Sequence, residues 1–393
     1  MDSTLIAGGR AAGRYARSRL RGMRRASPEP VGERPYRAKL ELTYHCNLRC
    51  GFCYTDSPRR TLERTPELDD AAWRRIVEES LELGIREAVI TGGEPLLRRE
   101  LALDAIERID DAGVDRIILN TNGWFVDGAI AARLARAGSL HVHISIDGPT
   151  PELHDAARGV PGSWRRAVRA ADLLLARGAR VRVLHVITPQ NEDALADFLE
   201  AMWLLGVRDL TLTPVVPVGA AARSGRWTVN RLRMYRRVRS FVERTDGAVR
   251  VSIENGFSGR LTTRAHTPNS FMVRPNGAFL ADSNHPFSFG DAGSQPLAEC
   301  WQALRDGWLD ERVRRWVDGV PRTRRVPAMD LVPYRDDEVA IGARPAAAGN
   351  GRALSQVDEA LRLLAAKSPP APEDGVGDLD AALAYIRDLA AGR

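Results

Sequence analysis

Hydrophobic and polar residues follow two different periodicities between residues 39 and 213, one typical of strands and one typical of helices. Short runs rich in β-branched residues are each followed by a longer stretch with apolar residues at helical spacing on one face. This alternation is typical of successive βα units around a parallel sheet. It predicts six strands, at residues 39–43, 87–91, 116–120, 142–146, 181–187 and 209–213.

The helices between these strands are expected at residues 70–83, 99–112, 129–137, 163–177 and 192–205. Right-handed crossovers would place every helix on the outside of the sheet. We therefore predict an α/β fold, a partial (β/α)6 barrel. Its functional residues are expected in the loops at the carboxyl ends of the strands.

The pattern changes after about residue 225, where a helix at 229–244 and a short strand at 248–254 precede a turn-rich segment. From about residue 340 the chain is rich in Ala, Gly and Pro, with amphipathic helices expected at 355–366 and 379–391. The sequence thus predicts a basic N-terminal extension, the barrel, a smaller α+β domain, and a linker with a helical tail, at residues 1–37, 38–225, 226–339 and 340–393.

Composition narrows the class of protein. The chain has 393 residues, 44% of them hydrophobic and 27% charged, which is ordinary for a globular protein. No apolar run is long enough to span a bilayer and no secretory signal is evident, so we expect a cytoplasmic protein. The net charge of +6 is spread along the chain and indicates no nucleic-acid partner. Only the arginine-rich stretch at residues 10–25 is concentrated, and it is either a solvated helix or a contact for an acidic partner or lipid surface.

Three cysteines lie close together just after the first predicted strand, in the run Cys46-Asn47-Leu48-Arg49-Cys50-Gly51-Phe52-Cys53. Thiolates at such spacing can hold an iron-sulfur cluster or zinc. A structural zinc site normally closes with four protein ligands, so three leave one metal position open. The zinc interpretation needs a fourth ligand, for which His45 is the nearest candidate.

Polar motifs end the next three predicted strands, and these are Thr91-Gly92-Gly93-Glu94-Pro95, Asn120-Thr121-Asn122-Gly123 and Ser145-Ile146-Asp147-Gly148. Paired glycines let a backbone come close to a ligand, and their carbonyls can accept hydrogen bonds from an ammonium group. Hydroxyl, amide and carboxylate side chains at a sheet edge can hold a ribose or an amino acid. Turn formation alone accounts for Asn-Gly and Asp-Gly about equally well.

The cysteine run, with the aromatic Phe52 before its last cysteine, resembles the signature of the radical S-adenosylmethionine (radical SAM) superfamily. The resemblance covers roughly residues 38–222. It implies one 4Fe-4S cluster held by Cys46, Cys50 and Cys53, with S-adenosylmethionine (SAM) bound to the fourth iron. It also implies reductive cleavage of SAM to a 5'-deoxyadenosyl radical that abstracts hydrogen from a substrate, and an electron donor such as flavodoxin or ferredoxin.

The same resemblance implies roles for the strand-end motifs. Gly92, Gly93 and Glu94 would receive the amino group of SAM, and Ser145 and Asp147 would lie near its ribose and carboxylate. The remaining cofactor-binding residues implied are Phe52, Asn122, Arg158 in a His-Asp-x-x-Arg-Gly stretch, and Val218 beside the adenine. An arginine at position 158 is suited to a bidentate pair with a carboxylate, although a structural salt bridge is the alternative.

Residues 271–282 and 289–301 resemble the start of a SPASM or twitch domain, but the cysteines expected there are missing. Asp282 stands about where one of them would be, and Cys300 is the single remaining thiol. An auxiliary cluster needs several cysteine ligands, so we predict one cluster per chain. Cys300 lies in an apolar helical setting that favours a buried structural thiol over a substrate-facing one.

Three functions remain open from the sequence. The first is a radical SAM enzyme that modifies a ribosomally made peptide or another natural product, since SPASM-like proteins commonly do so. The second is a radical SAM enzyme acting on a small molecule, such as an aminoglycoside, nucleoside or amino-acid derivative, because the 37 residues before the first strand are few for a leader-binding module. The third is a zinc-binding or regulatory protein on a radical SAM scaffold.

Overall fold

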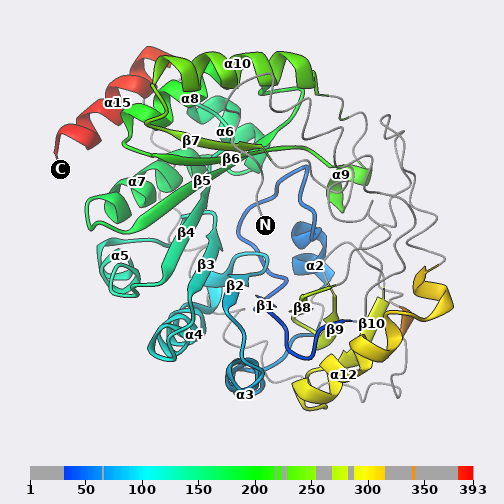
Figure 1. Cartoon of the computed structure of the whole chain (residues 1–393). Helices are drawn as coiled ribbons and strands as arrows, with labels where there is room; N and C mark the ends of the chain where they lie inside the picture. The colour runs from blue at the N-terminus through cyan, green and yellow to red at the C-terminus, as the bar shows by residue number, and fades with distance from the viewer. Residues whose placement is uncertain are drawn as a thin grey trace.

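The structure is a computed structural model of the chain, which describes residues 31–63, 66–216, 219–223, 227, 229–253, 268–281, 287–314, 339–340 and 379–392. Within these residues one sheet contains eleven strands in the order β11-β10-β9-β8-β1-β2-β3-β4-β5-β6-β7. The sheet curves into an open barrel with helices around its outside (Figure 1). The arrangement confirms the α/β fold and the partial barrel.

The first six strands agree with the predicted positions to within about two residues, the seventh lies within the strand predicted at residues 248–254, and the last four were not predicted. The described residues form eleven strands in all. They are β1 (Arg37–Glu41), β2 (Glu87–Thr91), β3 (Arg116–Thr121), β4 (Leu140–Ser145), β5 (Arg180–Ile187), β6 (Asp209–Pro214), β7 (Arg250–Ile253), β8 (Ser270–Val273), β9 (Ala278–Leu280), β10 (Phe287–Asp291) and β11 (Val339–Ala340).

The helices that cover the barrel follow their strands in chain order. They are α2 (Ser57–Glu63), α3 (Asp70–Glu82), η1 (Pro95–Arg98), α4 (Arg99–Asp111), α5 (Gly128–Leu134), α6 (Pro151–Arg158), α7 (Ser163–Leu175), η2 (Glu192–Ala194), α8 (Leu195–Leu204), α9 (Ala220–Arg223), α10 (Arg231–Arg244), α12 (Leu297–Gly307) and α15 (Leu379–Ala391). Several begin at a capping side chain; Asp69, for example, accepts a hydrogen bond from Ala72 N in the first turn of α3.

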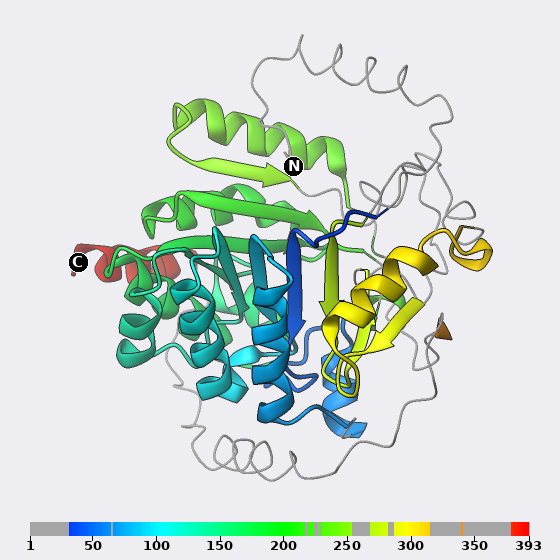
Figure 2. The same ribbon diagram turned by 60° about the horizontal axis from the view of Figure 1, so that its bottom comes forward.

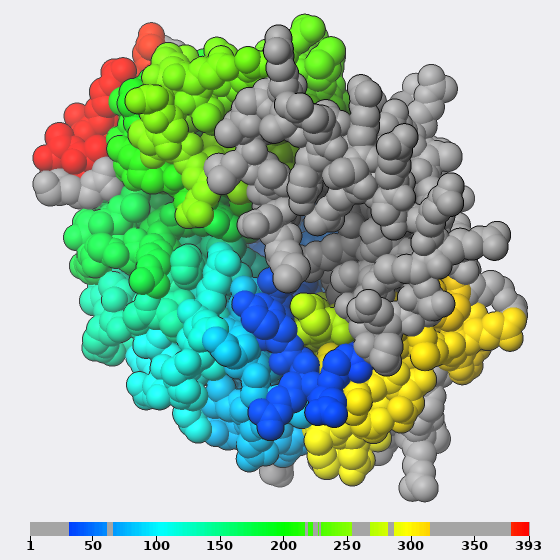
Figure 3. Space-filling view, in the orientation of Figure 1, coloured from blue at the N-terminus to red at the C-terminus, as the bar shows by residue number. Residues whose placement is uncertain are grey.

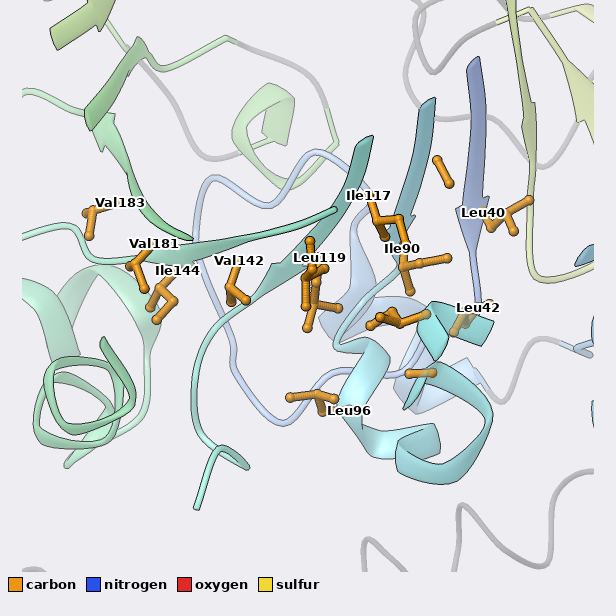
Figure 4. Packing of buried hydrophobic residues seen from close by; sticks show 14 of the residues in the cluster. Leu40, Leu42, Ile90, Leu96, Ile117, Leu119, Val142, Ile144, Val181 and Val183 are labelled. Atoms are coloured by element: carbon orange, nitrogen blue, oxygen red, sulfur yellow. The ribbon is translucent and has the colours of Figure 1, made fainter. Parts of the chain in front are cut away.

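Alternation along the strands separates an apolar outer face from a polar inner face. Leu40, Ile90, Leu119 and Val142 point outward and pack in the main core beneath the helices (Figure 4). On β1 the residues between the apolar ones are Lys39 and Glu41, which face the other way. The inside of the barrel therefore presents polar groups, while burial of the outer face stabilises the fold.

The sheet continues across the predicted domain boundary at residue 225. β7 pairs in parallel with β6, so it extends the barrel rather than the smaller domain. At the other side β8 pairs in parallel with β1, and β9 and β10 follow as antiparallel strands. The division into domains remains a prediction, since the described strands on both sides of it belong to one sheet.

The β8–β10 strands carry α12 on their outer side, next to α3 (Figure 2). Arg75 of α3 donates to the carbonyl oxygens of Ala292 and Gly293, and Leu297 N donates to Glu79 Oε2. The segment before β1, blue in the space-filling view, lies against the yellow α12 (Figure 3), where Trp301 Nε1 donates to Glu33 O. These contacts hold the C-terminal unit to the barrel.

The predicted C-terminal helix is confirmed as α15, which packs against α7 and α8, with the Tyr385 ring centroid 5.7 Å from that of Trp164. Three other predictions concern residues outside the described ones: the basic stretch at 10–25, the helix at 355–366, and the roles of Val218 and Asp282. Among the helices that the structure describes, none combines the length and apolar character needed to cross a bilayer.

Candidate functional site

The cysteine loop follows β1 at the carboxyl edge of the sheet, as predicted. Cys50 is buried, and Cys46 and Cys53 are half-buried. Apolar residues from the loop and from the segments after β6 pack around the thiols, and these are Leu48, Phe52, Val215 and Ala221. The three thiols thus belong to one apolar cluster that is separate from the main core.

The paired glycines after β2 pack directly on the backbone that leads into the cysteine loop. Gly93 N donates to Thr43 O at 2.6 Å, and Glu94 N donates to His45 O at 2.8 Å. A Cβ at Gly93 would lie 2.1 Å from His45 O, and one at Gly92 would lie 2.6 Å from Thr43 O. The glycines are required for this close approach, which fixes the position of the loop.

Glu94 joins the ends of β2 and β3. Its Oε1 accepts from Thr121 Oγ1 at 2.8 Å and from Leu96 N at 3.0 Å, and its Oε2 accepts from Asn122 N at 2.7 Å. Burial raises the pKa of Glu94 to about 7, although these hydrogen bonds favour the charged form. In this structure the carboxylate therefore organises the strand ends.

Asn122 links the end of β3 to the cysteine loop. Its Nδ2 donates to Asn47 Oδ1 at 2.9 Å and lies 3.9 Å from Cys46 Sγ, while its Oδ1 accepts from Trp124 N. Asn122 thereby ends one strand and orients the loop at the same time. Asn122 was predicted from the sequence as a site residue, but Asn47 was not. The one feature of the sequence that could have indicated Asn47 is its place between two cysteines.

Arg158 connects the thiols to the end of β4. Its Nη1 lies 3.6 Å from Cys50 Sγ, its Nη2 is 2.5 Å from Asp147 Oδ2, and its guanidinium lies over the Phe52 ring. Burial works against its charge, but the Asp147 carboxylate and the Cys50 thiol raise the pKa of Arg158. The predicted cofactor-binding residues Phe52, Asp147 and Arg158 therefore meet beside one cysteine.

A set of buried polar residues holds Asp147 in place, among them His154 of the His-Asp-x-x-Arg-Gly stretch. His154 Nδ1 accepts from Asp147 N at 3.0 Å, Asn191 Nδ2 donates to Asp147 O at 2.9 Å, and Asp147 Oδ1 accepts from Val186 N at 2.7 Å. Burial lowers the pKa of His154, so it is neutral and able to accept. Ser145, the last residue of β4, is half-buried two positions earlier.

A second polar group lies on the inner face beside the cysteine loop. Lys39 Nζ donates to the Tyr54 hydroxyl at 3.1 Å and lies 3.3 Å from Glu41 Oε1, and Tyr54 donates to the same oxygen at 3.2 Å. Tyr54 directly follows Cys53. Charged residues two positions apart within an apolar strand were the signal for this inner polar face.

The arrangement fits a cluster bound through thiolates. Burial raises the pKa of Cys50 to about 11, and burial together with the neighbouring Cys50 raises that of Cys46. Iron would offset this cost by binding the thiolate form. Two buried donors beside the loop, Arg158 Nε and Asn47 Nδ2, have no hydrogen-bond acceptor among the described residues, so they are suited to an anionic group.

The zinc interpretation finds less support in the geometry. His45, its proposed fourth ligand, has Nε2 at 3.7 Å from Glu67 Oε1. Among the described residues, no three His, Cys, Asp or Glu side chains are arranged around a single metal-ion position.

Two other buried residues, His185 and Cys300, lie away from the loop. His185 is buried between β5 and α8, where its ring stacks on Phe198 at 4.0 Å and its Nδ1 is 3.0 Å from Ile146 O. It therefore packs beneath a helix rather than facing the inside of the barrel. Cys300 is buried in α12, close to the backbone of Gly290.

Comparison with known proteins agrees with this geometry. Residues 40–202 match the model of the radical SAM superfamily. The chain is 31% identical over 185 residues to the AdoMet-dependent heme synthase of Oleidesulfovibrio alaskensis, which covers 47% of each chain. It is 36% identical over 185 residues to the mycofactocin maturase MftC of Mycobacterium ulcerans, covering 46% of this chain and 48% of the relative. The chain thus spans about half the length of the curated relatives it matches.

Solved structures show the same fold. Streptococcus suis SuiB bound to the precursor peptide SuiA superimposes with a TM-score of 0.57 at 15% identity, covering 80% of this chain and 73% of SuiB. Another SuiB structure, with bound S-adenosylmethionine, gives a TM-score of 0.56. Residues 40–202 therefore form a radical SAM domain, and enzymes of this superfamily use a 4Fe-4S cluster and SAM. The SPASM-like character of residues 271–301 stays a prediction.

Proposed function

We propose that this chain reductively cleaves SAM and directs the resulting radical to a hydrogen atom of a peptide substrate. The observation that carries the proposal is the joining of Cys50, Arg158 and Asp147 at the mouth of the barrel, where one guanidinium contacts a thiol and a strand-end carboxylate. Such a contact brings fixed positive charge to the position where a cluster and a cofactor carboxylate would lie.

In this proposal each residue of the site has a role in binding one of the two cofactors. Cys46, Cys50 and Cys53 would hold the cluster, with its fourth iron left for SAM. Gly92, Gly93, Glu94, Asn122, Ser145 and Asp147, with Phe52 and Val218, would bind SAM, and Arg158 would be available to pair with its carboxylate. When bound, these cofactors supply a one-electron cleavage of SAM that yields methionine and a 5'-deoxyadenosyl radical.

The chain's own residues orient these groups and exclude water. Glu94 and Asn122 connect the ends of β2 and β3 to the cysteine loop, so a ligand at the sheet edge meets prepositioned groups. The apolar side chains around the thiols, Leu48, Phe52, Val215 and Ala221, keep the site dry. A low-potential donor such as flavodoxin or ferredoxin would supply the electron.

A peptide substrate is supported by what the similar proteins are named for. MftC is a mycofactocin maturase, and SuiB was solved with its precursor peptide. The polar inner face formed by Lys39, Glu41 and Tyr54 offers hydrogen-bonding partners to backbone or side-chain groups of such a peptide. The sequence around Cys300 lacks the further cysteines that an auxiliary cluster needs, which supports one cluster per chain.

A small-molecule substrate is the second candidate. The relative with 31% identity is a heme synthase, and a pre-heme d1 synthase of Dinoroseobacter shibae is 34% identical over 195 residues. The polar inner face would serve a carboxylated small molecule equally well. Deuterium transfer into 5'-deoxyadenosine from labelled peptide or labelled small molecule distinguishes the two.

The proposed reaction is tested after anaerobic reconstitution. We expect about four iron and four sulfide per chain, as one 4Fe-4S cluster requires, and formation of 5'-deoxyadenosine when SAM and dithionite are added. Stoichiometric zinc without sulfide would overturn the proposal and favour the zinc-binding alternative. Iron well above the content of one cluster would leave the reaction intact and refute the single-cluster prediction.

A further inference from the structure

The cysteine loop and the start of α7 carry exposed arginines that have no acidic partner among the described residues. Arg49, between Cys46 and Cys50 in the chain, is exposed, and so are Arg166 and Arg169 on the first turns of α7. No carboxylate among the described residues pairs with any of these three guanidinium groups. We call Arg49, Arg166 and Arg169 the arginine face.

Other arginines at the barrel surface do form ion pairs with carboxylates. Exposed or half-exposed arginines of α4, of α5 and of the residues just after α5 bind carboxylates of the preceding helix, in the pairs Arg108–Glu78, Arg133–Glu107 and Arg136–Glu107. The acid nearest the start of α7 is Asp155, and both of its oxygens accept hydrogen bonds from residues 162–164. The charge of the arginine face is therefore left open to a partner in solution.

The arginine face adjoins the apolar cluster that contains the thiols. The Arg166 guanidinium lies 5.5 Å from the centre of the Trp124 ring, and Trp124 packs on the cluster of residues that surrounds the thiols. Arg49 lies against the loop between α6 and α7, where a Cβ on Gly159 would be 2.7 Å from Arg49 O. Trp124 and Val160 are both half-buried and pack against the cluster of residues around the thiols.

The opposite side of the loop is committed to other groups. Tyr54, directly after Cys53, turns inward to Lys39 and Glu41 on β1. Substrate and SAM would approach the cysteines from that inner side, which leaves the outer side for electron entry. Electron transfer between proteins falls off steeply with distance, so a donor must dock where the thiols lie just below the surface.

We propose that the arginine face is the docking surface for an acidic one-electron carrier protein of the flavodoxin class. The inference rests on the proposed function, since it assumes a cluster on Cys46, Cys50 and Cys53. Electron-transfer complexes are small and short-lived, and charge complementarity governs how fast they form. A few unpaired arginines around the half-buried aromatic Trp124 match these requirements.

The test combines two charge reversals, Arg49→Glu and Arg166→Glu, in the full chain. After anaerobic reconstitution, stopped-flow mixing with reduced flavodoxin gives the second-order rate of cluster reduction. We expect the double variant to react about tenfold more slowly at low ionic strength, with a weaker dependence on salt. Dithionite, which needs no docking surface, should reduce the cluster at the unaltered rate.

The control is Arg236→Glu, at an exposed arginine of α10 without a carboxylate partner among the described residues, and its charge change of two units matches that of Arg49→Glu or Arg166→Glu measured alone. This change lowers the net charge in the same sense but away from the cysteine loop, and it should slow the reaction with flavodoxin by less than twofold. An equal slowing in the control would mean that overall charge, not this face, governs the reaction. A double variant that reacts with flavodoxin at the parent rate would overturn the proposal.

A binding measurement separates this inference from the proposed function. Oxidised flavodoxin is titrated by calorimetry into protein that has not been reconstituted, so no cluster is required. We expect the affinity to fall about tenfold in the double variant and to stay unchanged in the Arg236→Glu control. If no cluster can be assembled, the proposed function fails while this titration still decides on the docking surface.

Discussion

The cysteine loop after β1 and helix α12 both hold buried thiols, in surroundings that differ in polarity. Cys50 lies 3.6 Å from the Arg158 guanidinium, and Leu48 N donates to Cys46 Sγ at 3.4 Å. Cys300 instead packs so closely on β10 that a Cβ on Gly290 would lie 2.7 Å from its sulfur. Burial raises the pKa of Cys300 to about 12. Burial also raises the pKa values of Cys46 and Cys50, so the two regions differ in their neighbours: the loop thiols have nearby donors that would stabilise a thiolate, whereas Cys300 is surrounded by close packing.

The largest expected difference is in iron binding. Cys50→Ala should remove one of three cluster ligands, so iron and sulfide content after reconstitution should fall severely and 5'-deoxyadenosine formation should be lost. Cys300→Ala should retain the iron and sulfide content of the parent protein. Colorimetric iron and sulfide analysis, with chromatography of the nucleoside product, measures both. Loss of iron in the Cys300→Ala protein would show that the two environments do not differ in this way.

The next expected effect concerns the ion pair beside Cys50. Arg158→Met leaves Asp147 buried without its partner, and breaking such a pair costs about 3–5 kcal/mol of unfolding free energy. Adding Asp147→Asn should recover much of that loss, because the uncompensated charge is gone. Urea unfolding of the single and double variants measures the recovery. Arg108→Met, which breaks an exposed pair with Glu78, is the control and should have a much smaller effect.

The fold could be predicted from periodicity because burial on one face leaves a clear pattern in sequence. The six predicted strands and the C-terminal helix α15 were found close to their expected positions. The strand β7 was predicted at residues 248–254, but its place in the sheet was not, because a single short strand carries no signal for its neighbour. Pairing of β7 with β6, and of β8 with β1, depends on tertiary contacts alone.

The site residues could be predicted where they belong to a short sequence motif. They could be predicted less well where residues distant in the sequence come together only in the folded chain. Cys46, Cys50 and Cys53, and the strand-end residues Glu94 and Asp147, lie together at the carboxyl edge as expected. His154 and Asn191 were missed as supports for Asp147, because their role is a hydrogen bond to backbone formed only in the folded chain. The assignment of each residue to SAM remains a proposal.

A pH effect on stability is expected from Glu67, which anchors the start of the cysteine loop. Its Oε1 accepts from Tyr44 N at 2.6 Å, and burial raises its pKa from 4.5 to about 7. Between these values the folded chain holds a proton that the unfolded chain has released. The stability this proton provides is therefore full below pH 4.5 and is lost as pH rises through 7.

Glu67→Gln removes this titration, so the variant should gain on the parent by about 3 kcal/mol between pH 4.5 and 7.5. Burial lowers the pKa values of His154 and His185, which gives the opposite slope, but both residues are present in the two proteins and cancel in the difference. Urea unfolding at a series of pH values measures that difference. A difference that does not change with pH would refute the assignment to Glu67.

The smallest expected effect tests the packing around Cys300. Gly290→Ala would bring a Cβ to 2.7 Å from Cys300 Sγ, and such overpacking costs about 1–3 kcal/mol of unfolding free energy. Combining it with Cys300→Ala removes the sulfur, so the double variant should be more stable than the two single effects added together. The control is Gly51→Ala in the cysteine loop, where a Cβ would meet nothing within 4 Å and stability should not change. Additive effects of Gly290→Ala and Cys300→Ala would mean that the thiol of α12 is not held by this contact.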